Sequence, residues 1–546
     1  MSGGRWVKSV YVAAIVLLCV VVVAACSKGG KTGDSSTGSA SPSAGAGASA
    51  AKEAIKFQLM VYDELVGGGK PLQDIKNYHI LPQLTKDLLE KEQVQVEFIG
   101  GGPRDNGYIK NVDLKMASQD IPDSLYLSKA QAEQYGSQGA LVDLAPLFKK
   151  YAPNVQKFID ANPGFKAFIT NDQGKIFSVP NQRAMVPTYS WAYRKDLLDK
   201  LNLKAPTTAD ELTEALRAMK KANSARTFFP LAFEGSSLQY LALGHVFGAE
   251  SKLNADGTLT GIYSPTGGGT DYFSPGFKKM IEYLNMLYTE GLLDPESANF
   301  ANNEESLTQK MVTGNAAITF RTPLRAREWQ AAGRKTDPAY TFTSMAPLKN
   351  IADGKQFLAT TAPYEDGRTM AVSAKSKHPE APVKFLDYLF SPEGTTLRRW
   401  GIEGQSYKVE NGKKKFLVTF EQTVDEQSQG KSWTTLNKDF AVFFAPPDAE
   451  AGIALQDADM QNQLNMLAPF IPKVPYVTLT LDQQKQMNDL TLQYGDKGNQ
   501  WVTQFITGKK PMSEWDAFLS DMDKLGYKKA SAIWQDAYKK YLQSVK

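Results

Sequence analysis

Two short stretches in which every second residue is apolar flank a stretch with helical spacing. Residues 55–61 and 94–98 alternate between apolar and polar side chains, which predicts a strand in each. Between them, the leucines at positions 81, 84, 88 and 89 fit one face of a helix. A strand, a helix and a second strand in this order form a βαβ unit and predict a parallel sheet.

The next part of the chain continues to mix helices and strands. Residues 108–118 predict a helix, and residues 121–127 and 316–320 predict strands. Residues 171–174 separate two apolar runs and predict a hairpin turn. The strand over 176–180 is expected to end at Pro180, because proline cannot donate to a ladder.

Helix boundaries are marked more clearly in the second half of the chain. Thr208 and Glu211 have the spacing of a capping box. Pro275 and Gly291 bracket a second helix, and Ser391 begins a third. The last forty residues predict packed amphipathic helices, with Trp515 and Trp534 assigned to the core. The apolar stripes of these helices are Leu212, Ala215, Leu216, Met219; Phe277, Met280, Ile281, Leu284, Tyr288; and Trp515, Phe518, Leu519, Leu525, Ile533, Tyr538.

The N-terminus has the pattern of a secretory signal followed by a lipid-attachment site. Arg5 and Lys8 precede an apolar run over 10–23 that is too short to span a bilayer comfortably. Small residues then lead to Cys26, and residues 23–26 resemble the bacterial lipobox, which implies a lipidated cysteine at the mature N-terminus. Residues 26–52 predict a flexible tether rich in Ser, Gly and Ala. An uncleaved membrane anchor with an incidental cysteine is the alternative.

Composition narrows the classes of function. The 546 residues suffice for two domains, and the formal net charge of +4, without a basic tail, argues against nucleic acid as a partner. Of the two cysteines, Cys19 lies in the signal, so we expect no disulfide. The only histidines, His79, His245 and His378, are far apart in sequence, which disfavours a zinc site or a histidine-based catalytic site.

Two sets of residues have a partial likeness to chemical motifs. Gly67–Lys70 lacks the spacing of a phosphate loop, and Pro71 replaces its Ser/Thr, so a plain loop is favoured. Glu403, Asp457 and Asp459 could be cast as glycosidase acids, but nothing singles out a pair at the required separation. Aromatic residues make up 11% of the chain, and binding clefts commonly combine aromatic walls with a few polar groups.

Five short sequence motifs occur along the chain, at residues 119–123, 149–154, 191–198, 283–296 and 401–407. These motifs resemble those of the extracellular solute-binding proteins of bacterial ABC importers, in particular the large lipoproteins similar to alginate- and maltose-binding proteins. The resemblance runs in the same order along the whole chain.

This resemblance implies a two-lobed α/β fold of the type II periplasmic-binding-protein class, with the ligand cleft between lobes joined by crossing strands. The N-terminal lobe would comprise residues 53–185 and 360–400, and the C-terminal lobe residues 190–355 and 405–546. Crossing strands are expected near 179–193 and 346–370. The alginate-binding relatives carry a calcium loop, but residues 220–227 offer no acidic ligand here, so we expect no metal and no cofactor.

The resemblance also suggests where a saccharide would bind. We expect an aromatic wall and a set of polar partners near the crossing strands, with ordinary packing or surface roles as the alternative for each residue. The aromatic candidates are Trp191, Trp329, Tyr364, Trp400, Tyr407 and Trp433, and the polar candidates are Asp63, Glu64, Arg104, Gln182, Arg183, Glu234, Arg321 and Glu403.

The expected function is that of a non-enzymatic, monomeric importer subunit, lipid-anchored through Cys26 at the extracellular face of the cell membrane. It would capture an oligosaccharide or related saccharide and deliver it to the permease subunits by hinge closure. The alternatives are a peptide or another solute in the same cleft, a surface sensor, and a secreted glycan-processing enzyme.

Overall fold

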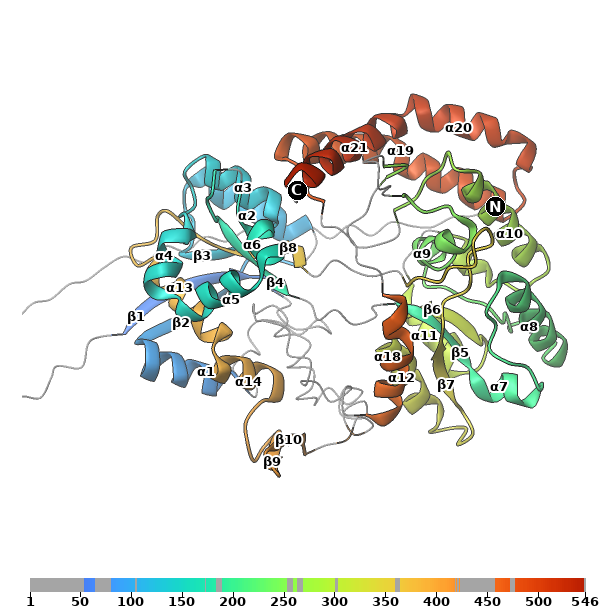
Figure 1. Ribbon diagram of the computed structural model, residues 1–546, viewed down its shortest axis with the longest axis horizontal. Coiled ribbons are helices and arrows are strands. Elements are labelled where there is room, and N and C mark those ends of the chain that lie inside the picture. The colour runs from blue at the N-terminus through green and yellow to red at the C-terminus, as the bar shows by residue number, and fades with distance from the viewer. Residues whose placement is uncertain are drawn as a thin grey trace, which may run out of the picture. The chain divides into compact units, whose positions relative to one another are not determined.

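The computed structural model describes residues 54–63, 80–103, 106–171, 173–182, 189–252, 259–262, 269–299, 303–358, 364–417, 419, 422, 457–471 and 477–544 (Figure 1). These belong to one compact unit, Glu53–Lys546. The predicted signal, Cys26 and the tether lie outside the described residues, as does Gly67–Lys70.

A five-stranded sheet is built mainly from the first part of the chain, in the order β2-β1-β3-β8-β4. β1 pairs in parallel with both β2 and β3, and Ile55 lies opposite Val94, which confirms the predicted βαβ unit. β8 comes from much later in the sequence and pairs antiparallel with β3 and β4. The strands are β1 (Ile55–Val61), β2 (Val94–Gly100), β3 (Ser124–Leu127), β4 (Ser178–Gln182) and β8 (Tyr364–Val372).

Helices pack around this sheet over a large apolar cluster. The ring of Phe385, on the buried helix α13, lies 5.8 Å from that of Phe57 on β1. The helices are α1 (Leu81–Asp87), α2 (Asn106–Ser118), α3 (Lys129–Ser137), α4 (Leu144–Tyr151), α5 (Pro153–Ala161), α6 (Pro163–Ile169), α13 (Glu380–Phe390) and α14 (Pro392–Trp400), with a π-helical turn, η2 (Leu88–Glu92).

Several details in this part differ from the sequence predictions. β3 begins three residues later than predicted and β4 two residues later. Leu89 is 47% exposed, because the π-helical turn that starts at Leu88 turns it away from the buried stripe. The turn at 171–174 follows helix α6 instead of a strand, so it is no hairpin, and its residue 172 lies outside the described residues. Pro180 does not end β4, which continues to Gln182. β4 is an edge strand and its register shifts after Pro180, so the missing N–H is tolerated.

A three-stranded antiparallel sheet has the order β6-β5-β7. Trp191 and Phe320 belong to one apolar cluster, whereas their neighbour Ala192 belongs to another that includes Trp329, so the two faces of the sheet are covered by different helices. The strands are β5 (Ser190–Arg194), β6 (Ile318–Arg321) and β7 (Phe342–Met345), and β6 begins two residues later than predicted.

The predicted helices of the second half are present. Pro275 and Ser391 occupy their expected places, and Gly291 takes the left-handed conformation, with φ 66°. The capping box at Thr208 is not fully formed: the Thr208 hydroxyl accepts from the backbone N–H of Glu211, while the Glu211 carboxylate accepts from Thr207. The helices are α7 (Lys195–Lys200), α8 (Ala209–Ala222), α9 (Ser236–Phe247), α10 (Pro275–Thr289), α11 (Glu304–Val312), α12 (Pro323–Gly333), α18 (Ala458–Leu467), α19 (Leu481–Ile506), α20 (Trp515–Lys524) and α21 (Tyr527–Ser544), with 3-10 turns at Pro295–Ala298, Ala468–Phe470 and Met512–Glu514.

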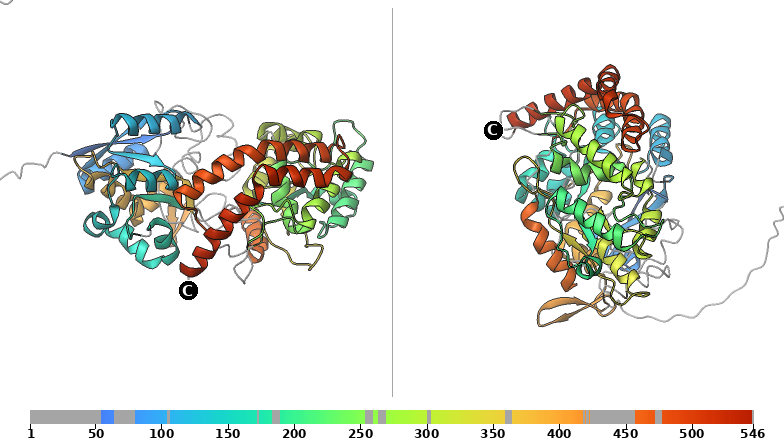
Figure 2. Two further views of the ribbon diagram at one scale, coloured as in Figure 1. Left: turned by 90° about the horizontal axis from the view of Figure 1, so that it is seen from above. Right: turned by 90° about the vertical axis from the view of Figure 1, so that its right-hand side faces the viewer.

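The C-terminal helices form a layer in which α19 packs against both α10 and α21 (Figure 2). Trp515 and Trp534 are both buried, as predicted, in the apolar cluster that also includes Trp191 and Phe320. A separate small hairpin consists of β9 (Tyr407–Glu410) and β10 (Lys413–Phe416).

The chain leaves one sheet for the other twice. It passes from β4 to β5 through residues 183–189, and returns from β7 to β8 through residues 346–363. The exact lobe limits given above stay predictions. Within the described ranges, no helix is long and apolar enough to cross a membrane, and no acidic, histidine or cysteine cluster could hold a metal ion.

Candidate functional site

Two neighbouring extended segments end in oppositely charged residues. Residues 230–233 run beside β6 in the same direction, with Leu231 bridged to Ile318. Glu234 follows the first segment and Arg321 ends the second. Because parallel segments end at the same edge of a sheet, the two side chains meet there, which is where α/β sheets commonly bind ligands.

The charged residues at this edge form a continuous network, which we call the β6-edge cluster: Glu234, Glu304, Arg321, Arg325 and Glu328. Arg321 contacts Glu234 through Nη1 at 2.5 Å and Glu304 through Nη2 at 2.9 Å. Arg325 contacts Glu304 at 2.5 Å and Glu328 at 2.6 Å. The side chains of Glu234 and Arg321 are 9% and 10% exposed, whereas Glu304 is 41% exposed, so the cluster runs from the interior to solvent.

Two helix N-termini hold the outer members of the cluster in place. Thr322 caps α12 by accepting from the backbone N–H of Arg325. Asn303 caps α11, and its backbone N–H donates to the carbonyl oxygen of Glu234. Glu304 then lies in the first turn of α11, where a negative charge is favoured by the helix dipole. The cluster is therefore held by backbone as well as by ion pairs.

The environment shifts the pKa values of Glu234 and Glu304, the two acidic residues that contact Arg321, in opposite directions. Burial raises the pKa of Glu234 above its usual value, although Arg321 acts against this. Burial also acts to raise the pKa of Glu304, but Arg325 and Arg321 outweigh it and lower that pKa below its usual value. The cluster thus presents a firmly ionised carboxylate at the rim and a more basic one inside.

Aromatic rings lie on the segments that carry Glu234 and Arg321 and on the neighbouring strand. Trp191 packs edge-on to Phe233 at 6.0 Å and to Phe320 at 5.7 Å, and it is 1% exposed. Tyr189 stacks on Phe320 with ring centroids 6.0 Å apart, and it is only half-buried. Tyr189 directly precedes Ser190, which pairs with Arg321, so it lies at the same edge of the sheet.

Among the predicted site residues, Glu234 and Arg321 are brought into direct contact. The structure adds Glu304, Arg325, Glu328 and Tyr189, which the sequence reasoning missed. The cap residues Asn303 and Thr322 could have indicated that two helices start beside Glu304 and Arg325, but no pattern in the sequence places those helices next to each other.

Apart from Glu403, the remaining polar candidates lie at the five-stranded sheet or outside the described residues. Asp63 follows β1 and accepts from the backbone N–H of Gly102, which follows β2. Gln182 on β4 is paired with Tyr364 on β8, so these two candidates are direct neighbours in the sheet. Four candidates lie outside the described residues: Glu64, Arg104, Arg183 and Trp433.

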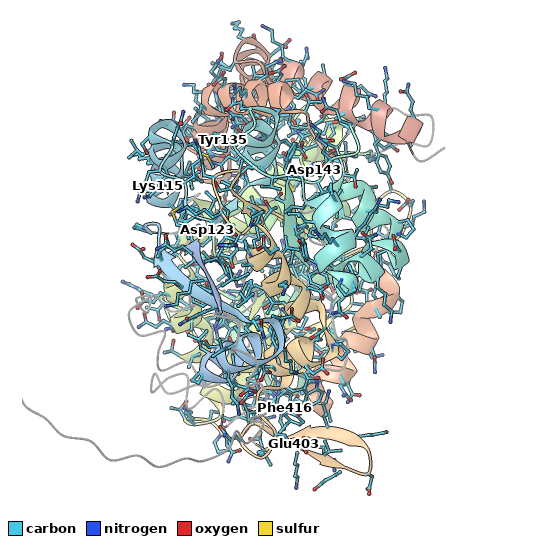
Figure 3. All side chains as sticks on the ribbon, turned by 90° about the vertical axis from the view of Figure 1, so that its left-hand side faces the viewer. Lys115, Asp123, Tyr135, Asp143, Glu403 and Phe416 are labelled. Atoms are coloured by element: carbon cyan, nitrogen blue, oxygen red, sulfur yellow. The ribbon has the colours of Figure 1, made fainter. Side chains whose placement is uncertain are left out.

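Three further candidates, Trp400, Glu403 and Tyr407, lie between the end of α14 and the start of the β9–β10 hairpin. Figure 3 labels Glu403 and Phe416 in this region. The ring of Trp400 lies 5.8 Å from that of Tyr407 and stacks at 4.7 Å on Phe416. Both Trp400 and Tyr407 are buried, whereas Glu403 is exposed. Packing among these rings therefore accounts for their positions, and their place in an aromatic wall stays a prediction.

Trp329 lies in the interior. It is 1% exposed, and its indole N–H donates to Thr308 at 3.1 Å. Its ring packs edge-on to Phe342. The ring is therefore packed and its N–H has an acceptor, so core packing accounts for the position of Trp329. A role of Trp329 in ligand binding stays a prediction.

A pocket of about 340 Å³ lies along the outer edge of β7. Gln330 accepts from the backbone N–H of Phe342, and Gln463 accepts from that of Ser344. The side-chain oxygens of both glutamines therefore complete the hydrogen bonding of an edge strand. The lining residues are Lys195, Gln330, Thr341, Phe342, Thr343, Ser344, Asp459, Asn462, Gln463 and Met466.

The β6-edge cluster is suited to hydrogen bonding. Its carboxylates accept hydrogen bonds and its guanidinium groups donate them, in rotamers already fixed by ion pairs. Asp457, considered above as a hydrolytic acid, forms a two-point ion pair with Arg327 and caps α18, so it has a structural role.

Comparison with known proteins gives a consistent result. A family model described as "Bacterial extracellular solute-binding protein" matches residues 73–396, which is more than half of the chain. The fructooligosaccharide ABC transporter substrate-binding protein FusA of Streptococcus pneumoniae serotype 4 (strain ATCC BAA-334 / TIGR4) is 22% identical over 469 residues, covering 79% of this chain and 82% of FusA. Lipoprotein LipO of Bacillus subtilis (strain 168) is 21% identical over 324 residues, or 56% of this chain and 61% of LipO.

Solved structures agree on the fold. FusA in complex with kestose has a TM-score of 0.69 at 19% identity, over 90% of this chain and 100% of that one. The alginate-binding protein AlgQ2 without calcium ion has a TM-score of 0.67 at 20% identity, over 89% of this chain and 98% of AlgQ2. These are two-lobed type II solute-binding folds, so the predicted fold class is confirmed.

Proposed function

Since this chain belongs to the family of bacterial extracellular solute-binding proteins, we propose that it captures an oligosaccharide for an ABC importer. The observation that carries the proposal is the β6-edge cluster, in which Glu234 and Arg321 are paired at 2.5 Å at the end of a buried strand. The similarity to FusA, named as a fructooligosaccharide-binding protein, supports a saccharide as the solute.

The cluster would bind sugar hydroxyl groups. A hydroxyl can donate to a carboxylate and accept from a guanidinium group, and both kinds of group are held next to each other here. Tyr189, with one face against Phe320, would offer an aromatic surface to the apolar face of a sugar ring. Oriented polar groups beside an apolar wall are the usual composition of a small-molecule site.

Capture would take place in the cleft between the lobes and be followed by hinge closure, and the closed form would be delivered to membrane permease subunits. The chain would act as a binding protein without catalytic activity. We propose residues 183–189 and 346–363, which connect the two sheets, as the segments that carry the hinge.

We also propose that the mature protein is anchored at the outer face of the membrane by lipid on Cys26. The signal-like run before Cys26 and the similarity to lipoprotein LipO support this. Intact-mass measurement of the membrane fraction tests it: loss of residues 1–25 together with added lipid is the expected result. An unmodified chain that starts at Met1 would overturn the anchor.

Calorimetric titration of the purified mature chain with a panel of oligosaccharides and peptides tests the function. We expect micromolar or tighter binding of at least one oligosaccharide and no release of reducing ends from it. Binding of peptides with no response to any saccharide would overturn the proposed solute class. Turnover of a bound glycan would overturn the non-enzymatic role.

A further inference from the structure

The charges of the β6-edge cluster decide which saccharides it can accept. The cluster holds three carboxylates and two guanidinium groups, so it carries an excess of negative charge when all five are ionised. Each terminal nitrogen of Arg321 already faces a carboxylate, of Glu234 on one side and of Glu304 on the other. The terminal nitrogens of Arg325 likewise face Glu304 and Glu328.

An acidic ligand would therefore find a carboxylate already beside each terminal nitrogen of Arg321 and Arg325. A uronate or a sulfated sugar needs a two-point contact with an arginine, or an unpaired positive charge, to replace the water it loses. Here a ligand carboxylate would have to displace Glu234 or Glu304 from Arg321, or lie close to them unpaired, and like charges at short range repel.

A neutral hydroxyl group has suitable partners in the same place. The Nε–H of Arg321 is buried and has no hydrogen-bond acceptor among the residues that the structure describes. The residue as a whole is 8% exposed. Buried donors without an acceptor are uncommon, and a ligand oxygen is one way to complete them.

We propose that the β6-edge cluster is a subsite that selects neutral, hydroxyl-bearing sugar residues over uronates and sulfated sugars. This rests on the proposed saccharide-binding function. Glu304 and Arg325, at the exposed rim, set the charge that an arriving ligand meets, and Arg321 together with Glu234 makes the buried hydrogen bonds.

A purely structural ion-pair network, fastening β6 to α11 and α12, is the competing explanation. It predicts that changes in the cluster alter stability without altering the choice of ligand. Ligand selectivity in folded variants therefore separates the two explanations.

The test measures dissociation constants of the full mature chain for matched trisaccharides. The neutral probes are kestose, maltotriose and α-1,4-galactotriose, and the acidic probes are trimannuronate and α-1,4-trigalacturonate. We expect at least one neutral trisaccharide to bind at least tenfold more tightly than either acidic one. Preferential binding of an acidic trisaccharide would overturn the inference and leave the proposed function standing. No binding of any saccharide in this set or in the wider panel would overturn the proposed function as well.

Variants then assign the effect to the cluster. Arg321→Gln should weaken neutral binding at least tenfold, and Glu304→Gln should reduce the preference for neutral over acidic probes at least fivefold. Glu290→Gln, which breaks an Arg217–Glu290 pair of 2.6 Å elsewhere among these helices, is the matched control and should change neither value. Unchanged affinity and preference in both cluster variants would overturn the assignment. If Arg321→Gln does not fold, Arg325→Gln, at the partly exposed rim, takes its place with the same criterion.

Discussion

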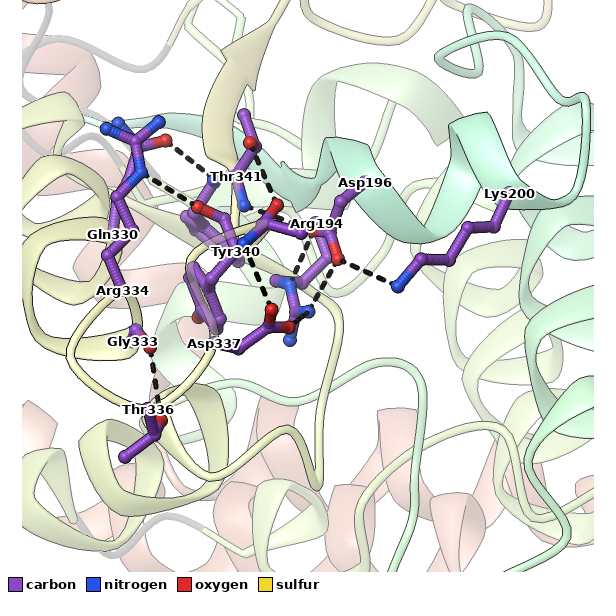
Figure 4. Close-up of polar contacts among 12 residues, drawn as sticks. Arg194, Asp196, Lys200, Gln330, Gly333, Arg334, Thr336, Asp337, Tyr340 and Thr341 are labelled. Atoms are coloured by element: carbon purple, nitrogen blue, oxygen red, sulfur yellow. Dashed lines mark hydrogen bonds and ion pairs between the residues drawn. The ribbon is translucent and has the colours of Figure 1, made fainter.

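Arg194 and Asp196, two residues apart in sequence, form a two-point ion pair in which Nε and Nη2 each lie 2.7 Å from a carboxylate oxygen (Figure 4). Both side chains are more than nine-tenths buried. The guanidinium carbon also lies 3.8 Å from the centre of the Tyr340 ring, and Asp196 accepts from the backbone N–H of Thr341. The pair thus joins the end of β5 to the start of α7 and to the chain before β7.

We expect Asp196→Asn to destabilise the fold by about 3 kcal/mol, because it leaves the buried guanidinium with only a longer contact of 3.8 Å to the more exposed Asp337. Arg194→Lys should cost about 2 kcal/mol, since lysine keeps the charge but cannot form both hydrogen bonds or stack on Tyr340. Urea unfolding checks both values. Asp199→Asn, which breaks the exposed Lys195–Asp199 pair, is the control and should change the unfolding free energy little.

The Arg194–Asp196 pair also predicts that the stability of the fold decreases at acidic pH. Burial acts to raise the pKa of Asp196, but Arg194 outweighs it, so the folded-state pKa is lower than the usual value. The resulting stability is present above the unfolded pKa of about 3.9 and is lost as the pH falls through the folded pKa. Unfolding free energies between pH 2 and pH 6 should therefore fall less steeply in Asp196→Asn than in the wild type. Parallel curves would contradict this.

The contacts of His245 predict a dependence of stability on pH with the opposite sign. Its Nδ1 lies 3.1 Å from Glu250 Oε1 and its Nε2 lies 3.0 Å from the carbonyl oxygen of Lys355, and both partners can only accept. Only the doubly protonated ring satisfies both. Burial acts to lower the pKa of His245, but Glu250 and the Lys355 carbonyl, with Asp353 nearby, outweigh it and raise it above the usual value.

This stabilising effect is fully present below the unfolded pKa of about 6.5 and is lost as the pH rises through the raised folded pKa. We expect His245→Asn to lower the melting temperature more at pH 5.5 than at pH 8.5, as measured by circular dichroism. His378→Asn, at a more exposed histidine, serves as the comparison. An equal loss at both pH values would show that His245 acts only through packing.

The side chain of Gln463 stabilises the edge strand β7 by accepting a backbone hydrogen bond. Its side-chain oxygen accepts from the backbone N–H of Ser344 at 3.0 Å, and the residue is 6% exposed. Gln463→Leu should destabilise the fold by about 2 kcal/mol, because the N–H stays buried without its acceptor. Thermal and urea unfolding measure this. Asn465→Ala, at an exposed position on the same helix, should have little effect, and a similar loss there would point to helix propensity instead.

Tyr189 predicts a change in ligand affinity. If its ring stacks on a sugar, Tyr189→Ala should weaken binding of the best neutral trisaccharide about tenfold, which corresponds to about 1.4 kcal/mol. Tyr189→Phe keeps the stacking surface and should bind within about threefold of the wild type. Calorimetric titration at one temperature compares the three proteins. Equal affinity in all of them would remove Tyr189 from the site.

Much of the fold follows from local patterns in the sequence. Alternation over 55–61 and 94–98 marked two strands that indeed pair in parallel, and the helices expected at Thr208, Pro275 and Ser391 begin there. The errors were local as well. Whether Leu89 is buried depends on a π-helical turn, and whether Pro180 ends a strand depends on that strand being at an edge, and neither is visible in a run of side chains.

The sequence by itself determined the family resemblance, the mixed α/β class and the identities of Glu234 and Arg321 as polar candidates. Only the tertiary structure decided that these two residues form an ion pair, that Glu304 and Arg325 complete the cluster, and that Trp191 and Trp329 are enclosed by core packing. The physical reason is the range of the interactions. Helix caps and strand alternation act between near neighbours in the chain, whereas the β6-edge cluster exists because β6, α11, α12 and residues 230–233 converge at one end of a sheet.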